Sequence, residues 1–276
     1  MQRPSSFFFW LVLLLVLSLG GCDAGEGELG DDDDVADDDD ATDDDDAADD
    51  DDSVEPTFPE SVALTTADGL TVAGTYQAAP GVDSGPAVLL LHQYGNDRHD
   101  YDAIWSLFHE SGLATLAIDF RSHGESDQAS VSTEELLSDP DQLRHDVEAA
   151  LDWLASKEEV DPARIGVMGL SVGANMAVVA NHNRKAWGVA SIVAFSAKLS
   201  AVEALSSTSE LDLESALYVA SEGEEPQATD AVSLYELTAE PHRVELVLGT
   251  SSHGADLLQA SADARQGSVD WFAEQL

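Results

Sequence analysis

The sequence predicts an α/β fold with a mostly parallel central sheet, helices on both faces and an antiparallel hairpin at its start. Between residues 87 and 276, short and largely apolar runs of strand length, of which 87–91 is uninterrupted, alternate with segments of helical periodicity. Such runs are typical of strands buried on both faces, and the alternation calls for parallel strands joined by crossover helices. Ahead of them, residues 62–66 and 70–76 alternate polar and apolar side chains around Asp68-Gly69, which indicates the hairpin.

Six apolar runs are the candidate parallel strands: residues 87–91, 113–118, 165–168, 189–195, 216–220 and 244–248. The expected helices are residues 101–111, 141–154, 174–182 and 268–276. The second of these has the clearest pattern, because Leu143, Val147 and Leu151 recur at helical spacing. Asp139-Pro140 supplies a start signal just before it.

A serine stands in the turn between the strand at 165–168 and the helix at 174–182, in the pentapeptide Gly169-Leu170-Ser171-Val172-Gly173. A turn this short forces the serine backbone into a strained conformation, and the glycines let strand and helix approach closely. The hydroxyl is then exposed at the carboxyl edge of the sheet, where the N–H groups that open the helix point at the group it attacks. The pattern predicts a nucleophile at Ser171.

The structural alternative is a small-residue turn between a strand and a packed helix. The spacing of Gly166, Gly169 and Gly173 does not fit a dinucleotide fingerprint, and a phosphate loop would carry a Lys beside the Ser. No metal-binding spacing such as H-E-x-x-H occurs either. We therefore expect no cofactor and no metal, and the strand and helix around Ser171 favour the nucleophile.

Residues 60–276 resemble the α/β-hydrolase superfamily, in its dienelactone-hydrolase-like and serine-esterase branches. The resemblance rests on the turn around Ser171, which is typical of a nucleophile elbow, on an acid after a later strand and on a late His. Two further stretches are similar to family landmarks: Leu89-Leu90-Leu91-His92 and Asp119-x-Arg121-Ser122-His123-Gly124-x-Ser126. It implies the α/β-hydrolase fold and a catalytic triad. Dienelactone hydrolases proper use a Cys nucleophile where this chain has Ser171, so their substrate is not implied.

The resemblance also implies the chain order Ser, acid, His, which leaves His182, His242 and His253 as candidate bases. A neutral imidazole with a pKa near 6.5 is suited to take the serine proton. His182 lies late on the elbow's own helix, and His242 precedes a strand at the opposite edge. His253 follows the strand at 244–248 by a short loop, so we expect it to be the base; the alternative is a helix-start residue that caps backbone.

The orienting acid should follow the strand at 216–220, where Glu222, Glu224 and Glu225 are available and the family's usual Asp is absent. Counting three residues past Ser221 selects Glu224, with Glu225 second and Glu222 third. A Glu can hold the imidazole Nδ1–H as an Asp does. The plain alternative is a set of solvated surface carboxylates.

The tetrahedral intermediate needs preformed hydrogen-bond donors. The first expected donor is the N–H of Val172, and the second is the N–H of Tyr94, with that of Gln93 as the alternative. Many family members carry His-Gly where this chain has His92-Gln93, which is a departure at the oxyanion loop. We expect His92 to be structural, and Asp119, Arg121 and His123 to hold the adjoining loop.

The first 56 residues are of another kind. Residues 7–19 are an apolar run of 13 residues with a single Ser, too short for a comfortable membrane span and suited to a signal-peptide core. Leu19-Gly20-Gly21-Cys22 resembles a bacterial lipobox, which predicts a lipoprotein signal peptide over residues 1–22 with lipidation at Cys22. The alternatives are an ordinary secretory signal or an uncleaved anchor. Cys22 is the only cysteine, so no intramolecular disulfide is expected.

The formal charge of −44 is unevenly distributed. Residues 23–56 hold 20 acidic residues and no basic one, and residues 57–276 hold 35 acidic against 10 basic residues. The repeat from Asp31 to Asp52 has too little apolar content to fold, so residues 23–56 are expected to form a disordered Asp-rich spacer, with weak association of divalent cations as a secondary role. The charge excludes nucleic acid as a partner, because no basic patch exists to displace counterions from phosphate.

These observations predict a lipid-anchored protein of the bacterial cell envelope with one α/β-hydrolase domain over residues 57–276. The expected activity is serine hydrolysis of small-molecule carboxylic esters through an acyl-enzyme. The alternatives are a peptidase or amidase on the same scaffold, and an inactive, membrane-tethered binding module. The connection over residues 196–215 has only 20 residues, so a bulky lid is not expected and the site should be open.

Overall fold

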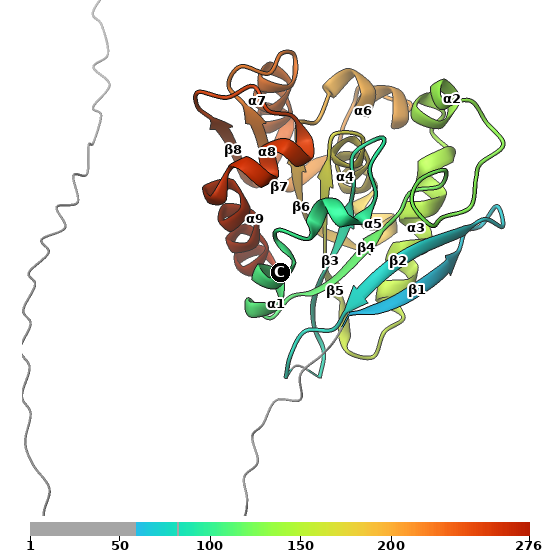
Figure 1. Ribbon diagram of the computed structural model, residues 1–276. Coiled ribbons are helices and arrows are strands. Elements are labelled where there is room, and N and C mark those ends of the chain that lie inside the picture. Colours follow the sequence, from blue (N-terminus) through green and yellow to red (C-terminus); the bar gives the residue numbers. More distant parts are fainter. Residues whose placement is uncertain (1–58, 82) are drawn as a thin grey trace, which may run out of the picture. The chain divides into compact units, whose positions relative to one another are not determined.

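The computed structural model describes residues 59–81 and 83–276, which form an eight-stranded sheet in the order β1-β2-β4-β3-β5-β6-β7-β8 (Figure 1). β1 pairs antiparallel with β2, and β2 antiparallel with β4, whereas all other neighbours are parallel. The α/β-hydrolase fold predicted from the sequence is therefore confirmed. The predicted signal peptide, Cys22 and the Asp-rich spacer lie outside the described residues and stay predictions.

Each predicted strand is present. The strands are β1 (Glu60–Thr65), β2 (Thr71–Gln77), β3 (Gly85–Leu91), β4 (Ala114–Ile118), β5 (Val160–Leu170), β6 (Val189–Phe195), β7 (Leu213–Ser221) and β8 (Thr238–Val247). β8 begins six residues before the apolar run at 244–248, because an edge strand pairs on one side only and accepts polar residues. His242 therefore lies within this strand, paired with Ala216, and not before it as predicted.

The helices of the described residues are η1 (Arg98–Tyr101), α1 (Trp105–Glu110), α2 (Thr133–Ser138), α3 (Gln142–Ala155), α4 (Val172–His182), α5 (Arg184–Trp187), α6 (Leu199–Leu205), α7 (Gln227–Leu237), α8 (Gly254–Ala260) and α9 (Ala262–Gln275). The prediction of one helix over residues 101–111 was wrong. The Asp97 carboxylate caps a separate 3-10 turn by accepting the N–H of His99, so that α1 begins only at Trp105. None of the helices in residues 59–81 and 83–276 is long and apolar enough to cross a membrane.

Helices cover both faces of the sheet. On one face, α3, α4, α6 and α7 bury apolar side chains such as Val147 and Met176 against alternate residues of the strands. On the other face, α1, α8 and α9 do the same through residues such as Phe108 and Phe272. The helices lie on both sides of the sheet, and the loops that follow the strands emerge at its edges (Figure 1).

The carboxyl ends of the central parallel strands meet at one edge of the sheet. His92 follows β3, Asp119 follows β4, Ser171 follows β5 and Ser196 follows β6. In open α/β sheets, ligands bind outside these ends. This edge is therefore where the candidate site is built.

Candidate active site

Ser171 occupies a strained turn between β5 and α4, with φ 55° and ψ −111°. The flanking glycines are required by the packing: a Cβ on Gly169 would lie 2.0 Å from the Gly173 carbonyl oxygen, and a Cβ on Gly173 would lie 2.1 Å from the Leu91 carbonyl oxygen. Neither distance tolerates any side chain, so the pentapeptide has the close strand–helix approach expected of a nucleophile elbow.

The His253 imidazole lies directly against this serine. Its Nε2 is 2.6 Å from Ser171 Oγ, although the two residues are 82 positions apart in the chain. His253 is the N-cap residue of α8, yet its side chain makes no capping hydrogen bond, so the capping alternative does not describe it. The other two candidates are engaged elsewhere: His182 Nδ1 accepts the N–H of Asp212, and His242 Nδ1 lies 2.6 Å from the Thr238 carbonyl oxygen.

Of the three glutamates after β7, Glu224 reaches the imidazole. Its Oε1 contacts His253 Nδ1, and its Oε2 accepts a hydrogen bond of 2.8 Å from Ser196 Oγ. Glu225 instead accepts from Thr229 Oγ1, and Glu222 from the N–H of Gly249. Glu224 is 9% exposed, so its carboxylate is held between two partners largely away from water.

The contact with Glu224 is the largest influence on the pKa of the His253 imidazole. The hydrogen bond from His253 Nδ1 to the Glu224 carboxylate raises the pKa of the imidazole above its usual value, against the opposing effect of partial burial. Asp256 adds a smaller effect in the same direction. The side chain of His253 remains 41% exposed, so the imidazole is accessible to solvent.

Two backbone N–H groups, those of Val172 and Tyr94, remain the candidate oxyanion donors. α4 begins at Val172, and the first N–H groups of a helix have no acceptor within the helix. The N–H of Gln93 donates to Asp100 Oδ2 at 3.2 Å and is therefore occupied, which leaves the N–H of Tyr94 as the better second candidate.

His92 is a buried residue whose two ring nitrogens are both used by backbone. Nε2 accepts the N–H of Phe120 at 2.9 Å, and Nδ1 donates to the Gln93 carbonyl oxygen at 2.7 Å. Burial lowers the pKa of His92 to about 4, so it is neutral at physiological pH. These contacts agree with the structural role expected from the sequence.

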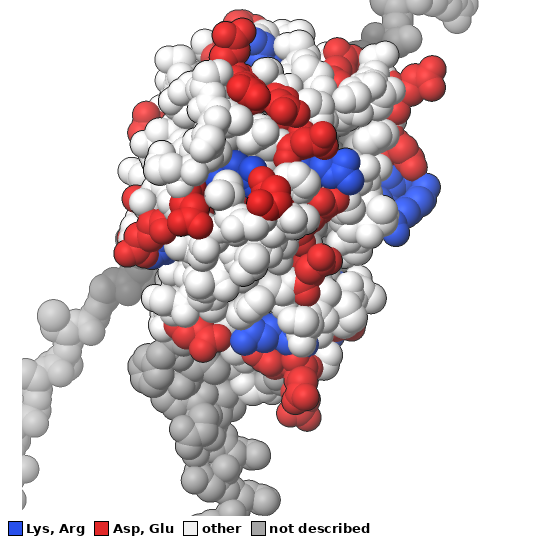
Figure 2. All heavy atoms as spheres, turned by 90° about the vertical axis from the view of Figure 1, so that its right-hand side faces the viewer, with Lys and Arg blue, Asp and Glu red and all other residues white. Residues whose placement is uncertain are grey.

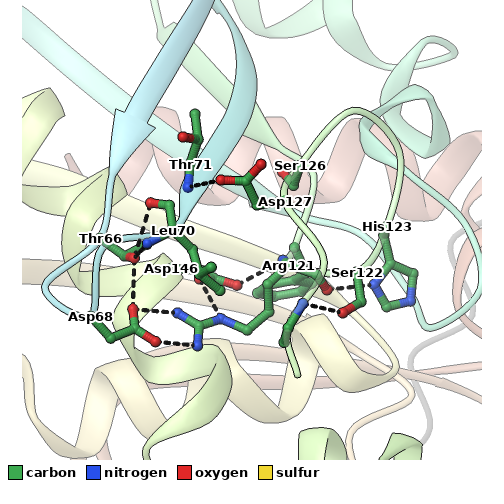
Figure 3. Close-up of polar contacts among 12 residues, drawn as sticks. Thr66, Asp68, Leu70, Thr71, Arg121, Ser122, His123, Ser126, Asp127 and Asp146 are labelled. Atoms are coloured by element: carbon green, nitrogen blue, oxygen red, sulfur yellow. Dashed lines mark hydrogen bonds and ion pairs between the residues drawn. The ribbon is translucent and has the colours of Figure 1, made fainter. Parts of the chain in front are cut away.

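The loop after β4 is held by charged side chains under the site. Asp119 accepts the backbone N–H groups of Arg98 and Glu125, at 2.8 and 2.9 Å, and pairs with the Arg98 guanidinium. Arg121 donates to both Asp68 and Asp146, as Figure 3 shows. His123 Nδ1 lies 3.1 Å from the Arg121 carbonyl oxygen (Figure 3). All three residues therefore make polar contacts that fix the loop.

A polar cleft of about 470 Å³ is lined in part by residues 94–97 of the loop after β3. Tyr94, a residue that is 47% exposed, forms one wall of it, and its ring packs edge-on against the His123 ring with 5.3 Å between the centroids. The other lining residues include Asn96, Ser122 and Thr133. Within residues 59–81 and 83–276, no group of three or more His, Cys, Asp or Glu side chains is arranged to hold a metal ion.

The sheet order, the elbow and its contacts define a protein of the α/β-hydrolase superfamily. The chain belongs to the family described as serine aminopeptidase, S33, whose model matches residues 83–247. Its sequence is 34% identical over 117 residues to an uncharacterized protein of Mycobacterium tuberculosis, a match covering 42% of this chain and 39% of the relative. It is 30% identical over 126 residues to thiohydrolase aneE of Aspergillus aculeatus, a match covering 45% of this chain and 37% of that relative. The chain thus spans well under two thirds of either relative.

Solved structures share the fold. The esterase Pf2001 of Pyrococcus furiosus superposes with a TM-score of 0.62 at 20% identity, covering 79% of this chain and 92% of the esterase. A dienelactone hydrolase from Anabaena variabilis superposes with a TM-score of 0.61 at 19% identity, covering 80% of this chain and 99% of the dienelactone hydrolase. At these identities the likeness extends to the fold and not to the substrate.

Two residues at the site were not assigned these contacts from the sequence. Ser196 Oγ donates to Glu224 and accepts the N–H of Gly254 at 3.1 Å. The side-chain oxygen of Gln93 accepts the N–H of Ala255 on α8. The signal available for Ser196 is its position directly after β6, at the same sheet edge as Ser171. For Gln93 the available signal is that this chain has Gln after His92, where many family members have Gly.

Proposed function

We propose that the protein is a serine hydrolase that cleaves carboxylic ester bonds through an acyl-enzyme. The observation that carries the proposal is the continuous hydrogen-bonded line from Ser171 Oγ through the His253 imidazole to the Glu224 carboxylate. A serine hydroxyl is a weak nucleophile unless a base takes its proton, and this line supplies a base and the group that orients it.

In the acylation step, Ser171 Oγ attacks the ester carbonyl carbon as His253 Nε2 takes the hydroxyl proton. Glu224 keeps the other imidazole proton on Nδ1 and stabilises the imidazolium that forms. The N–H groups of Val172 and Tyr94 donate to the negative oxygen of the tetrahedral intermediate. The carbon–oxygen bond to the alcohol then breaks, and His253 returns the proton to the leaving alkoxide.

In deacylation, His253 takes a proton from a water molecule, which attacks the acyl carbon. The intermediate collapses with release of the carboxylic acid, and the proton on His253 returns to Ser171 Oγ. The exposed side of the imidazole gives water access for this step. The tyrosine-walled cleft is proposed to receive one side of the substrate, since it shares Tyr94 with the oxyanion loop.

The test is a fluorophosphonate probe together with hydrolysis of p-nitrophenyl acetate. We expect the wild type to be labelled and to turn over, and Ser171→Ala to lose labelling and at least about 1,000-fold of kcat, because the nucleophile is gone. Ser207→Ala is the matched control, since Ser207 also has a positive φ, of 53°, but no contact with His253. Unlabelled, correctly folded wild type would contradict the proposal in favour of the inactive binding module.

A second candidate is hydrolysis of peptide or other acyl bonds on the same triad. It is favoured by the family description, which names a serine aminopeptidase, and by the relative that is described as a thiohydrolase. The triad attacks an ester, a thioester or an amide by the same steps, and the leaving group decides the difficulty. A panel of matched ester, thioester and aminoacyl-amide substrates, compared by kcat/KM, separates these candidates.

A further inference from the structure

The residue after His92 is unusual for this fold, because Gln93 stands where many α/β-hydrolases carry Gly. Its side chain does not point into solvent. Gln93 Oε1 accepts the backbone N–H of Ala255 at 2.9 Å, across 162 positions of the chain. Ala255 lies in the first turn of α8, two residues after His253.

The first turn of α8 lacks a cap of its own. The N-cap residue is His253, whose ring nitrogens contact Ser171 and Glu224. The ring therefore does not accept the N–H groups of the residues that follow it in α8. Helix-opening N–H groups need acceptors, which a Ser, Thr, Asp or Asn at this position would supply. Here Ser196 Oγ accepts the N–H of Gly254, and Gln93 Oε1 accepts that of Ala255.

The fit around Gln93 is tight. A Cβ on Gly254 would lie 2.3 Å from Gln93 Oε1 and 3.5 Å from the Cβ of Ser171, so the glutamine amide, this glycine and the elbow are packed together. Gly254 also has φ 49°, a conformation that glycine adopts without strain. A glycine next to His253 therefore makes the room that the Gln93 side chain fills.

The backbone of Gln93 is fixed as well. Its N–H donates to Asp100 Oδ2, and the same carboxylate accepts from Asn96 Nδ2 through its other oxygen. Gln93 is thus anchored on the oxyanion loop at one end and on the His253 helix at the other. A displacement of α8 relative to the sheet edge would break the bond to Ala255.

We propose that Gln93 is a positioning residue, whose side-chain carbonyl holds the first turn of α8 so that the His253 imidazole lies between Ser171 Oγ and Glu224. The proposal rests on the proposed function for its kinetic consequences, but the placement of His253 can be measured without any turnover. Loss of the acceptor should loosen the His253 loop and leave the other residues of the site in place.

The decisive variant is Gln93→Met, which keeps the length of the side chain and removes the oxygen acceptor. Misplacing a catalytic group by about 1 Å costs on the order of 100-fold, so we expect kcat for p-nitrophenyl acetate to fall about 10- to 100-fold with KM changed by less than about twofold. Gln93→Glu retains an acceptor oxygen at the same distance and should keep kcat within about threefold of the wild type. Gln259→Met, at the exposed far end of α8, is the control.

The second readout is the titration of the His253 imidazole by NMR. Glu224 and Asp256 are the carboxylates that raise its pKa, so a His253 that leaves Glu224 for part of the time must titrate at lower pH. We expect a lower pKa in Gln93→Met and an unchanged one in Gln259→Met. In Gln93→Glu, the added negative charge should keep the pKa of His253 at or above its wild-type value.

Unchanged kcat and an unchanged His253 titration in Gln93→Met would overturn the proposal. So would a loss in Gln93→Glu as large as that in Gln93→Met, since the acceptor would then be irrelevant. If Gln93→Met does not fold, Gln93→Asn decides, because it keeps the amide but is one methylene too short to reach Ala255. If the wild type hydrolyses no ester, the proposed function fails, and the NMR titration alone supports or overturns the role of Gln93.

Discussion

At the scale of single residues, the choice of Glu224 as the candidate acid follows from the turn that carries it. The N–H of Glu224 donates to the Ser221 carbonyl oxygen at 3.1 Å, which folds the chain back after β7. This turn directs the carboxylate towards His253 and Ser196, whereas Glu222 and Glu225 lie on other sides of it. Three adjacent carboxylates therefore have three different environments.

The pH profile tests the role of Glu224. In the proposed mechanism the neutral imidazole of His253 is the base, so activity should rise with pH through its pKa. The acid limb of kcat/KM should lie above pH 6.5 because Glu224 raises that pKa. In Glu224→Gln the carboxylate charge is lost, so the acid limb moves to lower pH, while the plateau falls on the order of 10⁴-fold. Glu225→Gln is the control and should leave both unchanged; equal losses in the two variants would contradict the assignment.

At the scale of elements, Arg121 ties the β1–β2 hairpin to α3. Its Nη atoms donate to Asp68 in the hairpin turn, and its Nε donates at 2.8 Å to Asp146 on α3 (Figure 3). The side chains of Arg121 and Asp146 are almost fully buried, at 1% and 0% exposed. Burial raises the pKa of Asp146 to about 6 even beside the guanidinium, whereas the hydrogen bonds from Arg121 lower that of Asp68 to about 2.

The two carboxylates should therefore respond differently to the loss of the pair. Arg121→Met leaves Asp146 buried without its cation, which is expected to cost about 3–5 kcal/mol of unfolding free energy. Asp68→Asn removes only the more exposed partner and should cost less than about 1 kcal/mol. Urea-induced unfolding of the two variants measures the difference. A cost for Arg121→Met below that for Asp68→Asn would mean that the buried contact does not stabilise the fold.

At the scale of the whole molecule, residues 57–276 are strongly acidic, with 35 acidic against 10 basic residues. Figure 2 shows acidic side chains spread over one face, with a few basic ones among them. Such a charge keeps a protein soluble but destabilises the compact state through self-repulsion. Salt screens this repulsion over distances longer than about 8 Å at physiological ionic strength.

The melting temperature of the domain should therefore rise with salt. Between low salt and 0.5 M NaCl at pH 8, we expect about 1 kcal/mol of added stability, or about 2–4 °C in Tm for a domain of this size. The effect should shrink at pH 5, where the carboxylates begin to bind protons and the net charge falls. Differential scanning calorimetry at the two pH values measures it, and a Tm that falls with salt would show that attractive ion pairs outweigh the repulsion.

Much of the fold could be predicted from local sequence, because its strongest signals are local. The run at 189–195 is apolar except for Ser191 and coincides with β6. The elements that the sequence did not reveal include α5, with four residues, and the longer α7, with 11. The polar start of β8 was also missed, and it is held by pairing with β7. α9 begins at Ala262, six residues ahead of the prediction, where Ser261 caps it by accepting the N–H of Ala264. Neighbours in space, more than hydrophobic periodicity, stabilise such segments.

The sequence by itself determined the fold class, the elbow at Ser171 and the late position of His253, because each depends on spacing along the chain. Only the tertiary structure decided which of three glutamates meets the imidazole, and that Ser196 and Gln93 accept the first N–H groups of α8. These contacts join residues 28 to 162 positions apart, and they depend on the direction in which each loop points its side chains. That direction is set by packing between strand ends, which periodicity and composition do not encode.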